Sequence, residues 1–491
     1  MDIIKNNSSV RIKYGACNTI LVPYFTRGED TWLNGKKKRI EVELFTRDGK
    51  DMIIPAGMLF HMQGAEFTED HSVPYINSYE YTGDYGTLPS GIKLRPYQVD
   101  ILKEVIKHER GMAQIATGAG KTLIIAKFCE ICSNLVQGAT QLIIVPSSHL
   151  LHETSERLRS YGLEVNVYGE SRALEVGKIN VTMVTSILND VKSGKTDLDV
   201  IDIVVVDEAH HATAATYYEL ITGIKNARHV LGVSGSLLSR PIESYDWNEI
   251  FSFSLQESRL VSLFHKVIYE LNYDDLVKLG YLTDVHIYQI ETNVHSEKSK
   301  NFVSVAPETI ESEERLELLA DAVAYSEKIM GYERFICFTR TREAGERFLR
   351  KLEARGIKTL IAYGGAQNAF LNDGNIEYVG GNALFPKFAT GEFGALIATT
   401  SHEEGTDIPA CDAIVNLSGG KSIRQVLQRS GRAFRLSEGK NFALIIDTYD
   451  KGHRMTKEHS KERAQIFENR LNRKVVVVKS HKDMERTKLG K

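Results

Sequence analysis

The central and C-terminal parts of the chain carry short, largely apolar runs of residues separated by helical segments. Such runs are typical of strands buried on both faces, and therefore of a parallel sheet covered by helices. They occur in two groups, first at residues 141–145, 181–184, 201–206 and 229–233, then at residues 335–338, 395–398, 413–417 and 443–446. The sequence therefore predicts two successive α/β domains, with a boundary near residues 280–282.

The first 65 or so residues read instead as β-rich. Residues 39–45 alternate between polar and apolar with the period of two expected of a half-buried strand. Asn34-Gly35, just before them, is a strong hairpin signal because both residues tolerate positive φ. Residues 75–92 are rich in Tyr, Gly and Ser, and we expect them to form a linker. The sequence thus predicts a small β-rich N-terminal domain over residues 1–89.

The amino-acid composition is that of a folded protein and argues against a membrane protein and a disulfide-rich protein. Of the 491 residues, 42% are hydrophobic and 25% are charged, which is ordinary for a folded protein and, at about 150 residues per domain, indicates roughly three domains. No apolar stretch approaches the ~18–20 residues that span a bilayer, so no membrane association is expected. Five cysteines and the lack of a signal-peptide pattern argue against a disulfide framework and predict a cytoplasmic protein.

The charge is unevenly distributed along the chain. The net charge of −3 neither requires nor excludes nucleic acid, because a local patch binds phosphates whatever the total charge. Residues 454–491 hold twelve Lys and Arg against five acidic residues, and residues 36–39 form a second basic cluster. Each segment is either a solvated surface or a contact for nucleic acid, and charge alone leaves both interpretations open.

A glycine-rich segment suggests a phosphate-binding loop. Residues 116–122, Ala-Thr-Gly-Ala-Gly-Lys-Thr, follow a short apolar run and open a helical segment, which is the expected context of such a loop. Glycines let backbone N–H groups turn toward phosphate oxygens, and the helix N-terminus adds its positive end. We expect Lys121 to reach the β- and γ-phosphates of a nucleotide and Thr122 to offer its hydroxyl to Mg²⁺.

Two carboxylates follow the apolar run 204–206. At the end of a buried strand, the burial of the Asp207 and Glu208 carboxylates would cost free energy unless a cation or protons neutralised their charge. Asp207 fits a Mg²⁺ ligand, and Glu208 fits the base that orients or deprotonates an attacking water. The alternative, an acidic strand-to-helix turn without a function, becomes improbable beside the phosphate loop.

Residues 428–435, Gln-Arg-Ser-Gly-Arg-Ala-Phe-Arg, hold three arginines. A guanidinium keeps its proton and makes bidentate bonds to phosphate. Arg432 and Arg435 are spaced i, i+3 and would project from one face of a helix. They are candidates for arginine fingers toward a γ-phosphate, although taken alone a charged surface helix is the favoured alternative.

In this order, these segments resemble the motifs of superfamily 2 helicases and translocases of the DEAD/DEAH type. The resemblance covers roughly residues 90–450 and is specific, because the motifs keep both order and spacing. The matching segments are residues 94–98, 116–122 (motif I), 145–151 (Ia), 184–186 (Ib), 207–210 (II), 234–236 (III), 338–340 (IV), 404–409 (V) and 428–435 (VI). The run Asp-Glu-Ala-His-His-Ala at 207–212 is most similar to XPB/RecG-like and phage recombination helicases. Motif III has Ser234-Gly235-Ser236 in place of the usual Ser-Ala-Thr, and keeps both hydroxyls.

The resemblance implies an α/β fold with two tandem RecA-like parallel-sheet motor domains, at residues 90–282 and 283–450, and a basic C-terminal extension at 451–491. ATP with Mg²⁺ would bind in the cleft between the motor domains. The catalytic residues that it implies are Lys121, Asp207, Glu208, His210, Gln428, Arg432 and Arg435. The nucleotide-binding residues are Arg95, Gln98, Thr117, Gly118, Ala119, Gly120, Lys121, Thr122, Gly405 and Asp407, with Thr122 and Asp207 as the Mg²⁺ ligands. The nucleic-acid contacts are Pro146, Ser147, Thr185, Thr339, Arg340 and Thr400.

Three functions compete at this point. The first is an ATP-driven DNA helicase or translocase that acts on forked or branched DNA in replication, recombination or repair, with replication or recombination proteins as possible partners. The second is the motor of a restriction-type complex, or an RNA helicase. The third is a nucleic-acid clamp that does not hydrolyse ATP, and intact Lys121, Glu208, Arg432 and Arg435 count against it.

Overall fold

The computed structural model divides the chain into two compact units, which are described separately. The first unit comprises residues 1–115 and 120–270, and the second comprises residues 116–119 and 271–491. The structure describes residues 3–5, 7, 9–12, 26–33, 36–48, 51–56, 58, 69–70, 72–169, 173–235, 254–296, 302–363, 367–380, 384–399, 411–419, 434, 436 and 442–484.

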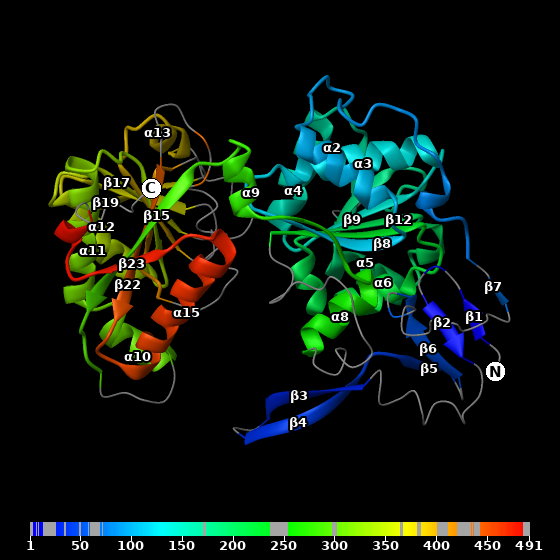
Figure 1. Cartoon of the computed structure of the whole chain (residues 1–491), viewed down its shortest axis with the longest axis horizontal. Coiled ribbons are helices and arrows are strands. Elements are labelled where there is room, and N and C mark those ends of the chain that lie inside the picture. Colours follow the sequence, from blue (N-terminus) through cyan, green and yellow to red (C-terminus); the bar gives the residue numbers. More distant parts are fainter. Residues whose placement is uncertain are drawn as a thin grey trace. The chain divides into compact units, whose positions relative to one another are not determined.

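The N-terminal segment of the first unit consists of strands, which confirms the predicted β-rich domain (Figure 1). Within its described residues, five strands form one sheet in the order β5-β6-β2-β1-β7, and β3 and β4 pair as a separate antiparallel hairpin. Leu33 pairs with Lys36. The predicted turn residues Asn34 and Gly35, between them in the sequence, lie outside the described residues. The strands are β1 (Ile3–Lys5), β2 (Ser9–Ile12), β3 (Thr26–Leu33), β4 (Lys36–Glu43), β5 (Thr46–Asp48), β6 (Asp51–Pro55) and β7 (Glu69–Asp70).

The rest of the first unit is a sheet with helices on both faces. Its described strands run in the order β10-β11-β9-β12-β13-β8-β14, and the pairs from β10 to β8 are parallel. Helices α2, α3 and α4 cover one face, and α5, α6 and α8 cover the other (Figure 1). The strands are β8 (Arg110–Ile115), β9 (Gln141–Val145), β10 (Val165–Val167), β11 (Ile179–Met183), β12 (Ile203–Asp207), β13 (His229–Ser234) and β14 (Val267–Leu271). The helices are η2 (Ile76–Ser78), α2 (Pro96–Ile106), α3 (Lys121–Leu135), α4 (Ser148–Ser160), α5 (Val184–Lys192), η3 (Leu198–Val200), η4 (Ala209–Thr213), α6 (Ala215–Gly223) and α8 (Leu255–Phe264).

The second unit repeats this layered plan. Its described strands form one sheet in the order β19-β18-β17-β20-β16-β21-β22-β15-β23, parallel except for the β17-β18-β19 edge. The strands are β15 (Asp284–Thr292), β16 (Phe335–Thr339), β17 (Thr359–Tyr363), β18 (Gln367–Asn372), β19 (Asn375–Gly380), β20 (Ala395–Thr399), β21 (Ala413–Asn416), β22 (Phe442–Asp450) and β23 (Val475–Val478). The helices are α9 (Tyr273–Lys278), α10 (Phe302–Thr309), α11 (Glu313–Lys328), α12 (Arg342–Glu353), α13 (Phe385–Ala389), α15 (Arg454–Leu471) and η6 (His481–Asp483).

The apolar runs of the sequence form the central strands, as predicted. Every residue of β9, β12, β13 and β16 is buried, because helices lie on both faces of each sheet. The two α/β domains and their RecA-like parallel sheets are therefore confirmed. The antiparallel hairpin of β18 and β19 was not predicted, although Asp373-Gly374 at its turn is a hairpin dipeptide and both residues have positive φ, 46° and 79°.

The sequence predicts a linker over residues 75–92, and this prediction is wrong. Tyr75, Ile76 and Leu88 are buried, and the backbone N–H of Ile76 donates to the Arg228 carbonyl at 3.0 Å. The buried Lys127 amine donates to the Thr87 carbonyl at 2.7 Å. The segment therefore packs along the first unit. Burial of its apolar side chains is more favourable than their exposure to water in a free linker.

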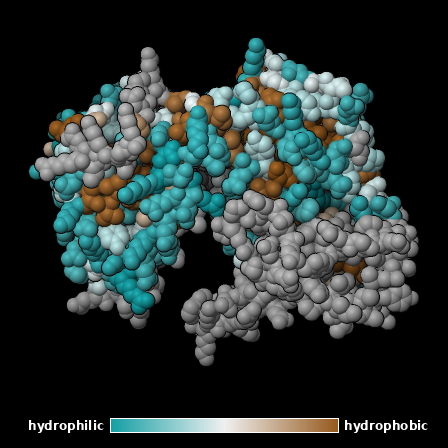
Figure 2. Space-filling view, viewed as in Figure 1, coloured by the Kyte–Doolittle hydropathy of each residue, from teal (hydrophilic) through white to brown (hydrophobic). Residues whose placement is uncertain are grey.

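The basic C-terminal stretch is part of the second sheet rather than a separate tail. Helix α15 packs against β22, and β23 pairs in parallel with β15. Hydrophilic residues dominate the exposed surface over α15 (Figure 2), but Arg463 of this helix is fully buried. The count of basic residues therefore overstates the charge that this stretch presents to a ligand.

Among the helices of the described residues, none is long and apolar enough to cross a membrane. The cytoplasmic location expected from the sequence stays a prediction.

We predict that deleting residues 455–491 unfolds the second unit. The deletion removes β23 and most of α15, and it takes Arg463 away from the buried carboxylates Asp447 and Asp450. Leaving a buried charge without its partner costs about 3–5 kcal/mol. Thermal unfolding and limited proteolysis should show the loss, while a control that lacks only residues 485–491 should unfold like the full chain. Identical unfolding of the two deletion variants would contradict this role of α15.

Candidate functional site

The predicted phosphate loop connects β8 to α3. Gly118 and Gly120 have φ angles of 91° and 81°, in the left-handed region that favours glycine. A Cβ atom at Gly120 would lie 2.6 Å from Nε2 of Gln98, so this position has no room for a side chain. Gly120 is also the N-cap of α3. The amides at the start of α3 are thus available to an anion, as predicted for a phosphate loop.

Gln98 and Arg95 lie at the start of α2 and support this loop. The Gln98 side chain is 2% exposed, and its Oε1 accepts a hydrogen bond from the Arg95 backbone N–H at 2.9 Å. This capping interaction fixes the amide, whose Nε2 is the atom nearest to the space above Gly120. The structure therefore brings two of the predicted nucleotide-binding positions, Gln98 and Gly120, together.

Asp207 and Glu208 follow each other at the carboxyl end of β12. Asp207 is buried, and its Oδ1 accepts from the Glu208 backbone N–H at 2.9 Å. Glu208 has a φ of 49° and a ψ of 52°, a left-handed conformation that costs a residue with a side chain about 1–2 kcal/mol. The strained backbone separates the two carboxylates, so that consecutive residues take different partners.

Glu208 is the centre of a small polar cluster. One carboxylate oxygen, Oε1, bonds to the Lys121 amine at the start of α3. The other, Oε2, accepts from the Ser234 hydroxyl at 3.1 Å and lies 3.3 Å from Nδ1 of His210. The same His210 nitrogen lies 2.7 Å from the Ser234 hydroxyl oxygen. Motifs I, II and III are thereby joined through one carboxylate in the first unit.

Burial and charge shift the pKa values of this cluster in opposite directions. Burial, followed by the negative charge of Glu208, raises the pKa of Asp207 to about 6. Burial would also raise the pKa of Glu208, but the Lys121 charge and the His210 hydrogen bond outweigh it, and the pKa of Glu208 is lowered. Burial would lower the pKa of Lys121, yet the Glu208 and Asp207 carboxylates raise it. Glu208 and Lys121 are thus a charged pair, and Asp207 is the carboxylate that lacks sufficient positive charge nearby.

These residues fit a nucleotide with Mg²⁺. Thr122 and Asp207 offer oxygen donors, and Mg²⁺ in phosphate-transfer sites takes one or two protein ligands while phosphates and waters complete its shell. The raised pKa of Asp207 agrees with a carboxylate built to meet a cation. Thr117 and Ala119 complete the loop, in which the Ala119 backbone N–H donates to the Ala116 carbonyl at 3.2 Å.

The predicted nucleic-acid contacts of the first unit follow β9 and open α5. Pro146 and Ser147 come directly after β9, and the Ser147 hydroxyl accepts from the Leu150 N–H at 3.3 Å as the N-cap of α4. Thr185 lies in the first turn of α5 and is exposed. Thr185 is accessible to a ligand, whereas the Ser147 hydroxyl already caps a helix.

In the second unit, the prediction for the Thr339 side chain does not agree with the structure. Thr339 is 1% exposed, and its hydroxyl donates to the Thr341 carbonyl at 3.2 Å. The neighbouring Arg340 pairs with Glu311 at 3.1 Å, and Thr341 donates to the same carboxylate oxygen at 3.1 Å. Sequence reasoning missed Glu311, because nothing in its surroundings in the sequence connects it to motif IV. Thr339 thus fixes the loop after β16 rather than offering its hydroxyl to a strand.

The remaining predicted residues lie outside the described residues. They are Thr400, Gly405, Asp407, Gln428, Arg432 and Arg435, together with Ser236 of motif III.

Comparison with protein families agrees with the geometry of the first unit. Residues 91–237 match the family "Type III restriction enzyme, res subunit", and residues 314–437 match the "Helicase conserved C-terminal domain". The first match spans the phosphate loop, the Asp207-Glu208 pair and Ser234. The second match lies within the second unit and ends after the motif VI arginines.

Curated relatives are helicases and translocases of low identity. The chain is 23% identical over 382 residues to a putative mitochondrial ATP-dependent helicase, irc3, of Schizosaccharomyces pombe, and this match covers 74% of the chain and 59% of the relative. It is 21% identical to the DNA 3'-5' translocase XPB2 of Sulfurisphaera tokodaii, covering 74% and 82%. It is 23% identical to a putative helicase of a Sulfolobus islandicus filamentous virus, covering 77% and 68%. The chain therefore spans well under two thirds of the fission-yeast relative.

Solved structures share the fold. The yeast Dbp5 protein bound to RNA and ADP BeF3 matches with a TM-score of 0.51 and 15% identity, covering 82% of this chain and 98% of that one. A putative HsdR subunit of a type I restriction enzyme from Vibrio vulnificus matches with a TM-score of 0.52 and 16% identity, covering 82% and 69%. The paired family matches and the helicase relatives place the chain among the superfamily 2 helicases.

Proposed function

We propose that this chain is a nucleic-acid-dependent ATPase that works as a DNA helicase or translocase on forked or branched DNA. The observation that carries the proposal is the cluster of Lys121, Glu208, His210 and Ser234 beside a phosphate loop. This arrangement links a phosphate-binding amine, a candidate base and a hydroxyl from a third motif. One of the relatives is named as an ATP-dependent helicase and another as a DNA 3'-5' translocase, which favours DNA as the substrate.

Lys121 and Glu208 would exchange partners when ATP binds. Without nucleotide the Lys121 amine neutralises Glu208 and keeps its pKa low, which makes the carboxylate a weak base. A γ-phosphate beside the loop would attract Lys121 away from Glu208. The freed carboxylate would then become more basic and could accept a proton from the attacking water. The ion pair would thus keep Glu208 a weak base until the γ-phosphate draws Lys121 away.

His210 and Ser234 would report the state of Glu208 to the end of β13. Both contact the Oε2 oxygen, so a change in charge at Glu208 alters the hydrogen bonds that they can form. Thr122 and Asp207 would hold Mg²⁺, which neutralises phosphate charge when bound. The second helicase domain would supply Gly405, Asp407 and Gln428 to the nucleotide, and Arg432 and Arg435 to the phosphates.

The nucleic-acid strand would be bound mainly through its sugar-phosphate backbone. Pro146, Ser147, Thr185, Arg340 and Thr400 are the proposed contacts, and phosphate contacts of this kind are indifferent to base sequence. Preference for a fork would then come from outside the motor domains, and replication or recombination proteins are the partners that we propose.

A second candidate is the motor of a restriction-type complex. The match of residues 91–237 to a restriction-enzyme subunit favours it. ATPase rates with fork DNA, linear duplex, single-stranded DNA and RNA compare the candidates, because a fork-specific motor should respond most to the fork.

We predict that Lys121→Ala and Glu208→Gln nearly abolish ATP hydrolysis but differ in ATP binding. Lys121 would contact the phosphates, so its loss should weaken binding, whereas Glu208 would act in the chemical step. Titration with a fluorescent ATP analogue and a steady-state ATPase assay separate the two effects. Nucleic-acid-stimulated turnover at the wild-type rate in either variant would exclude the assignment.

For Arg435→Ala we expect nucleotide binding close to the wild type and turnover lower by the ~10³ or more that arginine fingers supply. The same two assays test this expectation. If binding and turnover fell together, Arg435 would serve ground-state affinity instead.

The β3–β4 hairpin is the proposed fork-recognition element. It pairs only with itself in the described residues, and its register places Trp32 opposite Lys37 within the cluster of basic residues 36–39. An aromatic residue beside cations suits stacking on a base pair at a fork.

Replacing residues 27–42 by a short glycine linker should therefore preserve ATPase activity on single-stranded DNA and abolish fork preference. The five-stranded sheet does not include these strands, so the fold should persist, unlike after removal of residues 1–85. Glu41→Gln, which alters β4 without removing a cation, is the matched control. Equal fork preference in wild-type and hairpin-less protein at one salt concentration would assign the hairpin a structural or protein-docking role.

A further inference from the structure

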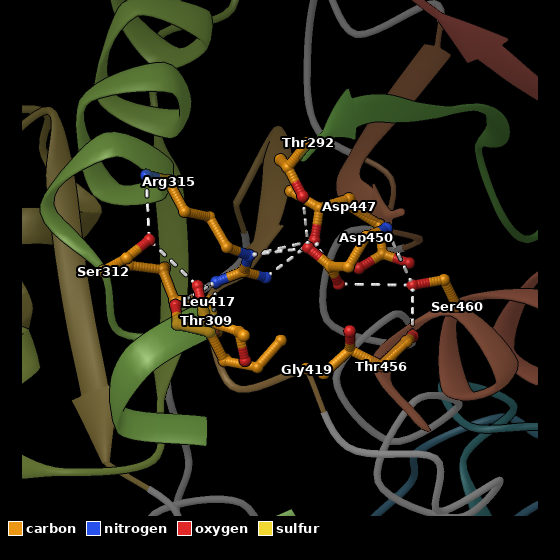
Figure 3. A network of polar contacts seen from close by, with 12 residues as sticks. Thr292, Thr309, Ser312, Arg315, Leu417, Gly419, Asp447, Asp450, Thr456 and Ser460 are labelled. Atoms are coloured by element: carbon orange, nitrogen blue, oxygen red, sulfur yellow. Dashed lines mark hydrogen bonds and ion pairs between the residues drawn. The ribbon is translucent and has the colours of Figure 1, made fainter. Parts of the chain in front are cut away.

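Arg315 and Arg463 are fully buried in the second unit, and neither was singled out by sequence motifs. Arg315 belongs to α11 and Arg463 to α15, helices far apart in the sequence. In Figure 3, Arg315 points from its helix toward Asp450 and the carbonyl end of β21. Removing each guanidinium group from water costs free energy, so complete burial of both must be compensated by other interactions.

Two aspartates of β22 provide the matching charge. Asp447 accepts from Arg463 Nε at 2.8 Å, from Asn416 Nδ2 at 3.0 Å and from Gln289 Nε2 at 2.9 Å. Asp450 lies 3.3 Å from Arg315 Nε and 3.8 Å from Arg463 Nη2. Burial would raise the pKa of Asp450, but the charges of Arg315 and Arg463 outweigh it and lower that pKa. The two arginines therefore favour the ionised form of Asp450.

Both arginines also donate to backbone carbonyls, and Arg315 donates in addition to the Thr448 hydroxyl at 2.8 Å. Arg315 donates to the carbonyls of Leu417 at 2.8 Å and of Asn416 at 3.2 Å. Arg463 donates to the carbonyl of Gly419 at 2.8 Å. Ser418, between them, donates its hydroxyl to Asn416 Oδ1 at 3.1 Å. Four consecutive residues after and at the end of β21 are thus fixed by hydrogen bonds from side chains.

The conformation at Gly419 adds a steric constraint. Its φ is 63°, and a Cβ atom there would lie 2.7 Å from the Ile310 side chain. The chain therefore leaves β21 along one path, which glycine alone permits and which the Arg463 hydrogen bond selects. In the sequence, residues 420–435 with Gln428, Arg432 and Arg435 follow directly.

Stability alone does not explain the network. Apolar side chains of similar volume would fill this space at no greater cost, since buried ion pairs often contribute little net stability. What apolar residues cannot do is bind three carbonyls in a fixed geometry, and the planar fork of arginine is suited to that task. We infer that Arg315 and Arg463 are positioning residues for ATP hydrolysis, which hold the backbone of residues 416–419 so that the motif VI segment starts from one defined conformation.

This inference rests on the proposed function, and it connects the C-terminal helix α15 to catalysis. The test is Arg463→Lys in the full chain, which keeps the charge beside Asp447 but loses the fork that reaches Gly419. Arg334→Lys is the matched control. Arg334 forms a bidentate pair with Asp412, at 3.1 and 3.3 Å, just before the opposite end of β21. Both variants lose one arginine fork against the same strand.

We expect Arg463→Lys to lower kcat for nucleic-acid-stimulated ATP hydrolysis about 10²-fold, as small misplacements of catalytic groups do. Affinity for a fluorescent ATP analogue should stay unchanged, and backbone amides of residues 417–419 should exchange hydrogen faster. Arg334→Lys should keep the wild-type kcat and exchange in that segment, even if it melts earlier.

An Arg463→Lys variant with wild-type kcat, or equal losses of kcat in both variants, would overturn the inference. Wild-type protein without nucleic-acid-stimulated ATPase would instead refute the proposed function. In that case the hydrogen exchange of residues 417–419 still decides whether Arg463 holds this backbone, since exchange as slow as in the wild type in both variants would exclude it.

Discussion

The parallel alignment of β8, β12 and β13 determines where the polar residues of the first unit can lie. Parallel strands end at one edge of a sheet, and the pairing of Asp207 with Val233 and of Ser234 with Gln114 brings three motifs to that edge. Lys121 reaches the same edge because α3 follows β8 through the phosphate loop. A shift of β12 by one residue would turn each side chain to the opposite face, so the Lys121–Glu208 pair depends on register.

Buried charged groups are compensated differently in the two units. In the first unit, burial and the charge of Glu208 raise the pKa of Asp207 to about 6. A cation bound beside this carboxylate would stabilise its ionised form. In the second, Arg315, Arg463, Asp447 and Asp450 satisfy one another and the backbone around them. The first arrangement suits a site that exchanges partners with a ligand, and the second suits a framework that must not move.

The C-terminal stretch illustrates why a charge count is an incomplete guide to binding. Residues 454–491 are strongly basic in sequence, yet Arg463 is buried against Asp447, and Arg473 bonds to Asp274 and Asp284. These partners lie far away in the sequence and become neighbours only when α15 and β23 join the second sheet. At least two of the twelve basic residues, Arg463 and Arg473, are therefore used to assemble the unit.

The sequence alone determined the two parallel sheets, because runs such as 142–145 and 203–206 are apolar at every position, and only a strand covered on both faces buries such a run. It also determined the phosphate loop and the acidic strand end, since glycines, Lys121 and Asp207-Glu208 are contiguous in the chain. Only the tertiary structure decided the rest. Glu311 meets Arg340, and Arg463 meets Gly419, across separations that no local pattern records. Thr339 and the 75–92 segment differ from what the sequence predicts. Burial depends on which residues pack against a segment, and the order of residues along the chain does not record those neighbours.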